Sequence, residues 1–158
     1  MSNSLLEDCA HDNARTTPGQ TTGNCAVPKQ YVHLHAEDAV LVTSWSQLGD
    51  DRYALTVRWP ESATETDGAS YDPRLLTQTL RQCCLLIAHA ERAVPLDHQT
   101  LMDRMDFSIA QDLRVPRNAP AELSVTLACR STGRRSMFVE MTLTHAGRQV
   151  AHSVIEFS

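Results

Sequence analysis

The sequence is poor in aromatic residues and has no long run of one kind of charge. Aromatic side chains make up 5% of the 158 residues and apolar side chains 42%, so we expect a core built mainly from Leu, Val, Ala, Met and Cys. The net charge is −5, and the basic residues are scattered. Because nucleic acid is bound through clustered cations, we expect no nucleic-acid partner.

Membrane spans, secretion signals and metal motifs are missing as well. The longest apolar stretch, Cys83 to Ala88, is far shorter than the roughly 20 residues of a transmembrane helix, and no charged-then-apolar leader opens the chain. The cysteines lack metal-ligand spacing and are expected to be reduced thiols, two or three of them in the core. We therefore expect a cytoplasmic protein with no cofactor, no metal and no membrane contact. The five cysteines are Cys9, Cys25, Cys83, Cys84 and Cys129.

The length argues for one domain preceded by a leader. Chains of about 100–200 residues usually form a single domain. Residues 1–28 are rich in Ser, Thr, Asn, Asp, Gly and Pro and show no hydrophobic periodicity, which predicts a flexible segment. The folded domain is predicted to cover residues 29–158.

One long helix is predicted from Asp72 to about Arg92. Asp72 can cap free backbone N–H groups, and Pro73 is suited to the first helical position. Pro95 bars continuation. Since the helix is apolar around most of its girth, we expect it to be buried on several sides. Its apolar stripe consists of Leu76, Leu80, Cys83, Ile87 and Ala90, widened by Leu75, Thr79, Leu86 and Ala88.

Six strands are predicted around this helix. Two precede it and four follow, with turn signals such as Gly49-Asp50-Asp51 and His145-Ala146-Gly147 between them. This order predicts an α+β fold in which one long helix covers one face of a curved antiparallel sheet, and a two-fold dimer is the economical assembly. The predicted strands are Ala39–Trp45, Tyr53–Trp59, Met102–Ala110, Ala121–Arg130, Ser136–His145 and Gln149–Phe157.

Several short segments in this order resemble the A-factor biosynthesis (AfsA-type) hotdog family. Residues 32 to about 110 carry the resemblance, and the later strands agree in pattern. The fold it implies is the hotdog fold, an antiparallel sheet wrapped around a central helix. The matching segments are Val32-His33, Val40-Leu41-Val42-Thr43-Ser44-Trp45, Trp59-Pro60, Asp72-Pro73, Leu80-Arg81-Gln82, Ala88-His89-Ala90 and Val94-Pro95-Leu96.

The resemblance also implies an activity. Family enzymes are credited with moving a β-ketoacyl group from a carrier-protein thioester onto dihydroxyacetone phosphate, which gives precursors of γ-butyrolactone signals in actinomycetes. The implied partner is therefore a thioester of acyl carrier protein or CoA. Relatives usually contain two hotdog repeats; this chain has room for one, so a homodimer would replace the tandem pair.

Three positions depart from the family pattern. Gln78 replaces the usual Glu of the central helix, and an amide cannot accept a proton as a general base. Glu61 follows Trp59-Pro60 where the family has His, and Leu34 stands where Arg is expected after Val-His.

Candidate site residues lie mainly on the predicted helix. Gln78, Arg81 and Leu85 share one face by their spacing. Burying Arg81 alone would be costly, so it is predicted to bind a phosphate, carboxylate or thioester oxygen, or else to form an ion pair across a subunit interface. Gln78 could bind a thioester carbonyl or orient a water, or could be a satisfied polar group. The ion-pair alternatives for Arg81 are Glu37, Asp38 and Asp72.

His33 is the best candidate for acid–base chemistry, because imidazole titrates near neutrality. The predicted catalytic set is thus Gln78, Arg81 and His33. His89 is expected to be a core or helix-end group. The amino end of the helix could stabilise an oxyanion, although Asp72 could also be only its cap. Residues assigned to substrate binding are Tyr71, Asp72, Gln82 and Leu85.

Two other functions remain open. One is a dehydratase or thioesterase of the same fold; a dehydratase would need Asp72 or His33 to complete its acid–base pair. The other is a binding or scaffolding module without catalysis.

Overall fold

The computed structural model describes residues 26–61, 71–99, 101–110, 119–133 and 136–158. The predicted leader therefore lies outside the described residues as far as residue 25. Val27 is already buried in the core, and an ordered segment leads from it into the short 3₁₀ helix η2 (Lys29–Val32).

The chain forms a six-stranded antiparallel sheet in the order β1-β2-β4-β5-β6-β3. Two strands precede the helix and four follow it, as predicted. The two edge strands, β1 and β3, come from opposite sides of the helix in sequence. The strands are β1 (Val42–Gly49), β2 (Arg52–Trp59), β3 (Met102–Ile109), β4 (Ala121–Ser131), β5 (Met137–His145) and β6 (Arg148–Phe157).

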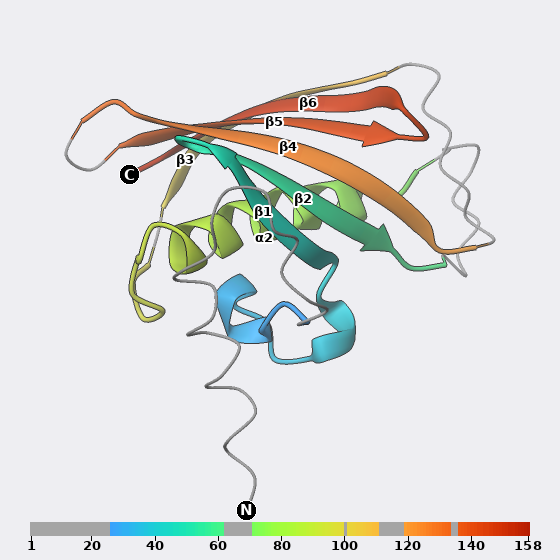
Figure 1. Ribbon diagram of the computed structural model, residues 1–158, viewed down its shortest axis with the longest axis horizontal. Helices are drawn as coiled ribbons and strands as arrows, with labels where there is room; N and C mark the ends of the chain where they lie inside the picture. The colour runs from blue at the N-terminus through green and yellow to red at the C-terminus, as the bar shows by residue number, and fades with distance from the viewer. Residues whose placement is uncertain (1–25, 62–70, 100, 111–118, 134–135) are drawn as a thin grey trace, which may run out of the picture.

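The helix α2 (Pro73–Ala90) lies against one face of the curved sheet (Figure 1). The two 3₁₀ helices, η2 and η3 (Glu37–Ala39), lie on the side of α2 away from the sheet (Figure 1), and η2 contacts α2. The helix is therefore covered from two sides, in the arrangement of a hotdog fold. This confirms the predicted fold class.

Alternation of apolar and polar residues explains which face of the sheet meets the helix. On β4, Leu123, Val125, Leu127 and Cys129 are buried and the residues between them are largely exposed. Each fully buried Leu or Val side chain stabilises the fold by about 1.5–3 kcal/mol. The hydrophobic face of β4, in the middle of the sheet, thus fixes the side on which α2 packs.

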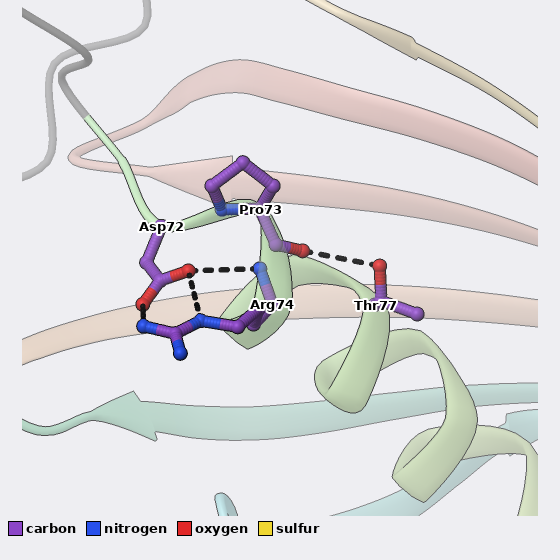
Figure 2. Close-up of polar contacts among 4 residues, drawn as sticks. All are labelled: Asp72, Pro73, Arg74 and Thr77. Carbon is purple, nitrogen blue, oxygen red and sulfur yellow. Dashed lines mark hydrogen bonds and ion pairs between the residues drawn. The ribbon is translucent and has the colours of Figure 1, made fainter. Parts of the chain in front are cut away.

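The start of α2 follows from the capping residue predicted in the sequence. The Arg74 backbone N–H donates to the Asp72 carboxylate at 2.9 Å, and the Arg74 side chain forms an ion pair with it at 3.2 Å (Figure 2). Thr77 donates its hydroxyl to the Pro73 carbonyl at 3.0 Å (Figure 2). Asp72 is therefore the N-cap, since its carboxylate takes an N–H that the helix cannot pair.

The helix ends earlier than predicted, at Ala90 rather than near Arg92. The Arg92 N–H donates to the Ile87 carbonyl, and the Val94 N–H to the Ala88 carbonyl at 3.0 Å. Between them Ala93 has a left-handed backbone with φ of 52°. The chain thus turns back over the last turn of α2 before Pro95.

The first strand also differs from the prediction, which began it at Ala39. Residues 37–39 form η3, and β1 begins at Val42. Gln82 of α2 is the reason: its amide accepts the Leu41 N–H at 2.7 Å and donates to the Ala39 carbonyl at 3.0 Å. These backbone groups are therefore bound to the helix and not to a neighbouring strand.

Candidate functional site

One face of α2 changes from exposed and polar to buried along the length of the helix. Positions 78, 81, 85 and 89 lie on the same side of a helix. Gln78 and Arg81 are exposed, whereas Leu85 and His89 are buried. The exposed polar residues of this stripe are therefore followed by buried residues near the end of the helix.

The exposure of Arg81 corrects one expectation. The sequence suggested that Arg81 is buried and needs a substrate oxygen or an ion pair across a subunit interface, but within one protomer its side chain reaches solvent. Two of the proposed partners are engaged elsewhere: Asp72 pairs with Arg74, and Glu37 pairs with Lys29 at 3.9 Å. The guanidinium is thus placed to meet a ligand from outside the protomer.

The covered end of the stripe contains a pair of histidines. His33 Nε2 lies 2.8 Å from His89 Nε2, and the ring centroids are 4.8 Å apart with their planes inclined by 29°. The other nitrogen of His89, Nδ1, donates to the Val94 carbonyl at 2.8 Å. His89 is buried and His33 is exposed, so the pair connects the interior with solvent.

His33 adopts an unusual backbone conformation to reach this position. It follows η2 with φ of 54° and ψ of 46°, the left-handed region, which costs a non-glycine residue about 1–2 kcal/mol. The turn is held by N–H bonds from His33 to the Gln30 carbonyl and from Leu34 to the Lys29 carbonyl. The neighbouring Val32 is fully buried and anchors the turn.

The electrostatic surroundings of His33 favour its neutral form. Partial burial lowers the pKa of His33, and the nearby His89 and Arg81 lower it further. A neutral imidazole can accept a proton, which a general base must do. Of the predicted catalytic set, Arg81 thus lies near enough to His33 for its charge to lower the pKa of the imidazole.

Gln82 occupies a buried position. Its side chain is 2% exposed, and both ends of its amide are already bonded to the backbone of residues 39 and 41. In the described structure this residue fastens the entry of β1 to α2. Its assignment to substrate binding stays a prediction from the sequence.

A second buried polar contact joins the helix to the sheet. The Trp59 indole N–H donates to the Thr79 hydroxyl at 2.7 Å, and that hydroxyl donates to the Leu75 carbonyl at 2.7 Å. Trp59, like Gln82 and His33, belongs to a segment that carries the family resemblance. The segments of Trp59 and His33, distant in sequence, both contact α2.

Tyr71 and Asp72 lie at the opposite end of the stripe. Nine residues separate Asp72 from Arg81, which is roughly 13 Å along a helix at 1.5 Å per residue. Pro73 has no N–H, and the Arg74 N–H is taken by Asp72. The amino end of α2 consequently offers fewer donors for an oxyanion than the sequence suggested.

Among the residues that the structure describes, no cysteine thiol is suited to act as a nucleophile. Burial raises the pKa of Cys83 to about 12 and raises that of Cys84 well above its usual value. Cys129 is also buried, with a raised pKa. All three are free thiols of the core, as the sequence predicted for two or three of the five; Cys9 and Cys25 lie outside the described residues.

His89 is the site residue that sequence reasoning missed. The sequence placed it in the core or at the helix end, and both are correct, but its partner His33 is 56 residues away. The only signal was that both lie in segments of the family resemblance.

In the described ranges no three His, Cys, Asp or Glu side chains are grouped to hold a metal. Across those same ranges, every helix is too short or too polar to cross a membrane.

The chain is similar to curated enzymes of Streptomyces. It is 36% identical over 133 residues to the 2-oxo-3-(phosphooxy)propyl 3-oxoalkanoate synthase of Streptomyces virginiae, covering 79% of this chain and 45% of that protein. A synthase of the same name from Streptomyces coelicolor is 32% identical, covering 65% of this chain and 34% of that protein. The chain thus spans less than half the length of these relatives.

The fold is similar to that of solved thioesterase structures. A hypothetical thioesterase protein with coenzyme A from Streptococcus pneumoniae superposes with a TM-score of 0.57 at 14% identity, covering 82% of this chain and 94% of that chain. At this identity the similarity shows the fold alone.

The family model of the A-factor biosynthesis hotdog domain matches residues 16–158 of this chain. The chain therefore belongs to the A-factor biosynthesis (AfsA) hotdog family.

Proposed function

We propose that this chain is an acyltransferase that moves a β-ketoacyl group from a thioester to a hydroxyl of a phosphorylated acceptor such as dihydroxyacetone phosphate. The observation that carries the proposal is the stripe of α2, where an exposed amide and an exposed cation share one helix face and the cation acts on a histidine that it helps to keep neutral. The names of the Streptomyces relatives, which describe an ester of a 3-oxoalkanoate with a phosphorylated three-carbon ketone, supply the substrate class.

The chemistry assigns one role to each side chain. His33 removes the proton of the acceptor hydroxyl through Nδ1, and the hydroxyl oxygen attacks the thioester carbonyl. The carbon–sulfur bond then breaks, the acceptor oxygen keeps the acyl group, and the leaving thiolate takes the proton back from His33. Arg81 binds the acceptor phosphate or the oxyanion, because a guanidinium forms strong charge-assisted hydrogen bonds to such oxygens.

Gln78 fits acyl transfer better than dehydration. Its amide can donate a hydrogen bond to the thioester carbonyl, whereas it cannot accept a proton. A dehydratase needs a second acid or base, and the sequence offered Asp72 for this. The Asp72 carboxylate instead caps α2 and pairs with Arg74, so the carboxyl group has a structural task far from His33.

Within the residues that the structure describes, one protomer leaves the face of α2 around Gln78 and Arg81 open. Ligand sites bury most of a ligand's surface, but the face around Gln78 and Arg81 is exposed. We assign the missing cover of this face to a second copy of the chain, because the matched part of this chain accounts for less than half the length of the relatives. The donor is a thioester of acyl carrier protein or CoA, and the cytoplasm, where buried thiols such as Cys83 stay reduced, is the proposed location.

The test is a reaction of the purified protein with a β-ketoacyl thioester of carrier protein or CoA. Mass spectrometry would follow the ester product with dihydroxyacetone phosphate and the free acid without it. We expect ester only when both substrates are present. Arg81→Ala should reduce kcat/KM by roughly 100-fold, as expected for loss of a charged ligand contact. The matched control is Arg58→Ala, an exposed arginine that follows the buried Val57 on β2 and so points away from α2.

Two outcomes would contradict the proposal. Free acid formed at the same rate with and without acceptor would indicate a thioesterase. Binding of the thioester without turnover would indicate a non-catalytic module, and then Gln78→Glu decides: it restores the carboxylate usual in the family. A gain of turnover in that variant would show that the module is an acyltransferase altered at one residue.

A further inference from the structure

The contact between His33 and His89 fixes where protons reside. His89 Nδ1 faces the Val94 carbonyl at 2.8 Å. A carbonyl only accepts, so His89 Nδ1 must bear the hydrogen. In the neutral ring the other nitrogen, Nε2, then holds a lone pair. His33 Nε2, which lies 2.8 Å from that lone pair, must therefore be the donor.

This chain of donors leaves one arrangement for the neutral pair. His33 bears its hydrogen on Nε2, so its lone pair is on Nδ1. We propose that His89 is a positioning residue that holds His33 in the tautomer with its lone pair on Nδ1, the nitrogen that takes the proton in acyl transfer. The inference rests on the proposed function for its catalytic meaning, whereas the tautomer itself is a property of the free protein.

The pair can accept one proton without being disrupted. When Nδ1 of His33 takes a proton from a substrate hydroxyl, His33 becomes a cation and still donates from Nε2 to His89. A second proton, on His89 Nε2, would place two N–H groups against each other at 2.8 Å. The geometry thus permits the proton transfer that a general base performs.

Two features of the backbone hold this arrangement in place. His33 lies at a left-handed position closed by hydrogen bonds of the η2 turn. Ala93 is also left-handed, and the turn through it brings the Val94 carbonyl back over the last turn of α2, where it meets His89. Unusual backbone conformations persist where the surrounding structure holds them, often at functional sites.

Charged groups act on His33 from α2, and the neighbouring elements in sequence, η2 and η3, carry further charges. His89 and Arg81 belong to α2, and both act to keep His33 neutral. Lys29, on η2, is paired with Glu37 of η3 at 3.9 Å. Asp38 is exposed on η3. The positive charge of Arg81 therefore disfavours a second positive charge on the His33 ring.

The experiment reads the tautomer directly. In protein labelled with ¹⁵N-histidine, long-range ¹H–¹⁵N correlation spectra at pH 7.5 distinguish a protonated ring nitrogen from one with a lone pair. We expect His33 to show a protonated Nε2 and a bare Nδ1. His89→Phe removes the acceptor and should give a mixture of tautomers. His89→Gln, whose amide oxygen can accept from His33, should largely restore the single tautomer.

A matched control separates this effect from general loss of a histidine. His152→Gln changes a half-buried ring on β6 that is bonded to Glu140 at 2.9 Å, and it should leave His33 unchanged. A bare Nε2 on His33 in the unaltered protein, or an unchanged tautomer in folded His89→Phe, would overturn the proposal. If His89→Phe fails to fold, the spectra of the unaltered protein and of His89→Gln still decide.

Kinetics then test the catalytic meaning. His89→Phe should lower kcat by about 10-fold or more with little change in KM, because only the proton-accepting step is affected. His89→Gln should recover most of that loss. A correct tautomer in a protein without acyl transfer would sink the proposed function and leave the positioning role of His89 intact.

Discussion

The protonation state of His33 decides whether the proposed acyl transfer proceeds. His33 is exposed, it touches a buried histidine, and it lies within the electrostatic influence of Arg81. Each of these features comes from a different segment of the chain. Its function as a base depends on them together rather than on imidazole alone.

The lowered pKa of His33 predicts the pH dependence of acyl transfer. The base must be neutral, so kcat/KM should be constant above the ordinary histidine pKa of about 6.5 and fall on acidification, with a midpoint below that value. Arg81→Gln removes a cation that disfavours the imidazolium and should therefore move the midpoint upward. The measurement is the pH profile of kcat/KM for both proteins.

An NMR titration of the His33 ring supplies the control for that profile, because it does not depend on substrate binding. The midpoint of the ring titration should match the kinetic midpoint in each protein. A ring that titrates above 6.5, or a midpoint that Arg81→Gln leaves in place, would contradict the assignment of His33 as the base.

At the scale of elements, α2 is fixed by polar contacts at separate points along its length. Gln82 binds the segment before β1, Thr79 binds Trp59 of β2, and His89 binds the turn that follows η2. The helix therefore has a defined rotation about its axis, which apolar packing alone would leave less specified. This rotation sets which residues form the open stripe.

Two glutamines on this helix provide a matched test. Gln82→Met keeps the size of the side chain but leaves the Leu41 N–H and the Ala39 carbonyl without their partners, and each unpaired buried group costs about 1–3 kcal/mol. Gln78→Met alters an exposed side chain and should change the free energy of unfolding by no more than about 0.5 kcal/mol. Urea denaturation of the three proteins measures the difference.

Equal stability of the two variants would show that the Gln82 contacts contribute nothing. A changed denaturant slope in Gln82→Met would instead indicate that the segment before β1 has detached, because the slope follows the surface exposed on unfolding.

Much of the fold could be predicted from local patterns, and the site only in part. The Asp72-Pro73 cap and the alternation on β4 depend on neighbouring residues, so both appear in the sequence. The late start of β1 does not, since it depends on Gln82, 41 residues beyond Leu41. The contact between His33 and His89 joins residues still further apart, 56 positions. Exposure of Arg81 could not be predicted because helical periodicity does not show which side a neighbour covers.

At the scale of the whole molecule, the edge strand β3 has apolar side chains without full cover. Met105, Phe107 and Ile109 share one face of the strand by their alternation. Met105 and Ile109 pack against the core, but Phe107 is 52% exposed. Leu101, just before the strand, is 65% exposed. An edge strand with an exposed apolar side chain on one face is a template for pairing with another chain, so we place the second copy there.

This placement predicts the effect of a single charge. Phe107→Asp puts a carboxylate where two copies would meet, and burying an unpaired charge is costly, so the dimer should dissociate into monomers. The matched control is Leu48→Asp, since Leu48 is 57% exposed on the opposite edge strand β1. Sedimentation measurements would give the mass of each protein in solution. Monomers in the unaltered protein, or dissociation caused equally by Leu48→Asp, would rule out β3 as the contact.

The same variant should also affect activity, because the open face of α2 needs a second copy to bury the acyl chain. Phe107→Asp should reduce acyl transfer in proportion to the loss of dimer. Activity restored at high protein concentration would show that the loss of activity follows from the loss of dimer.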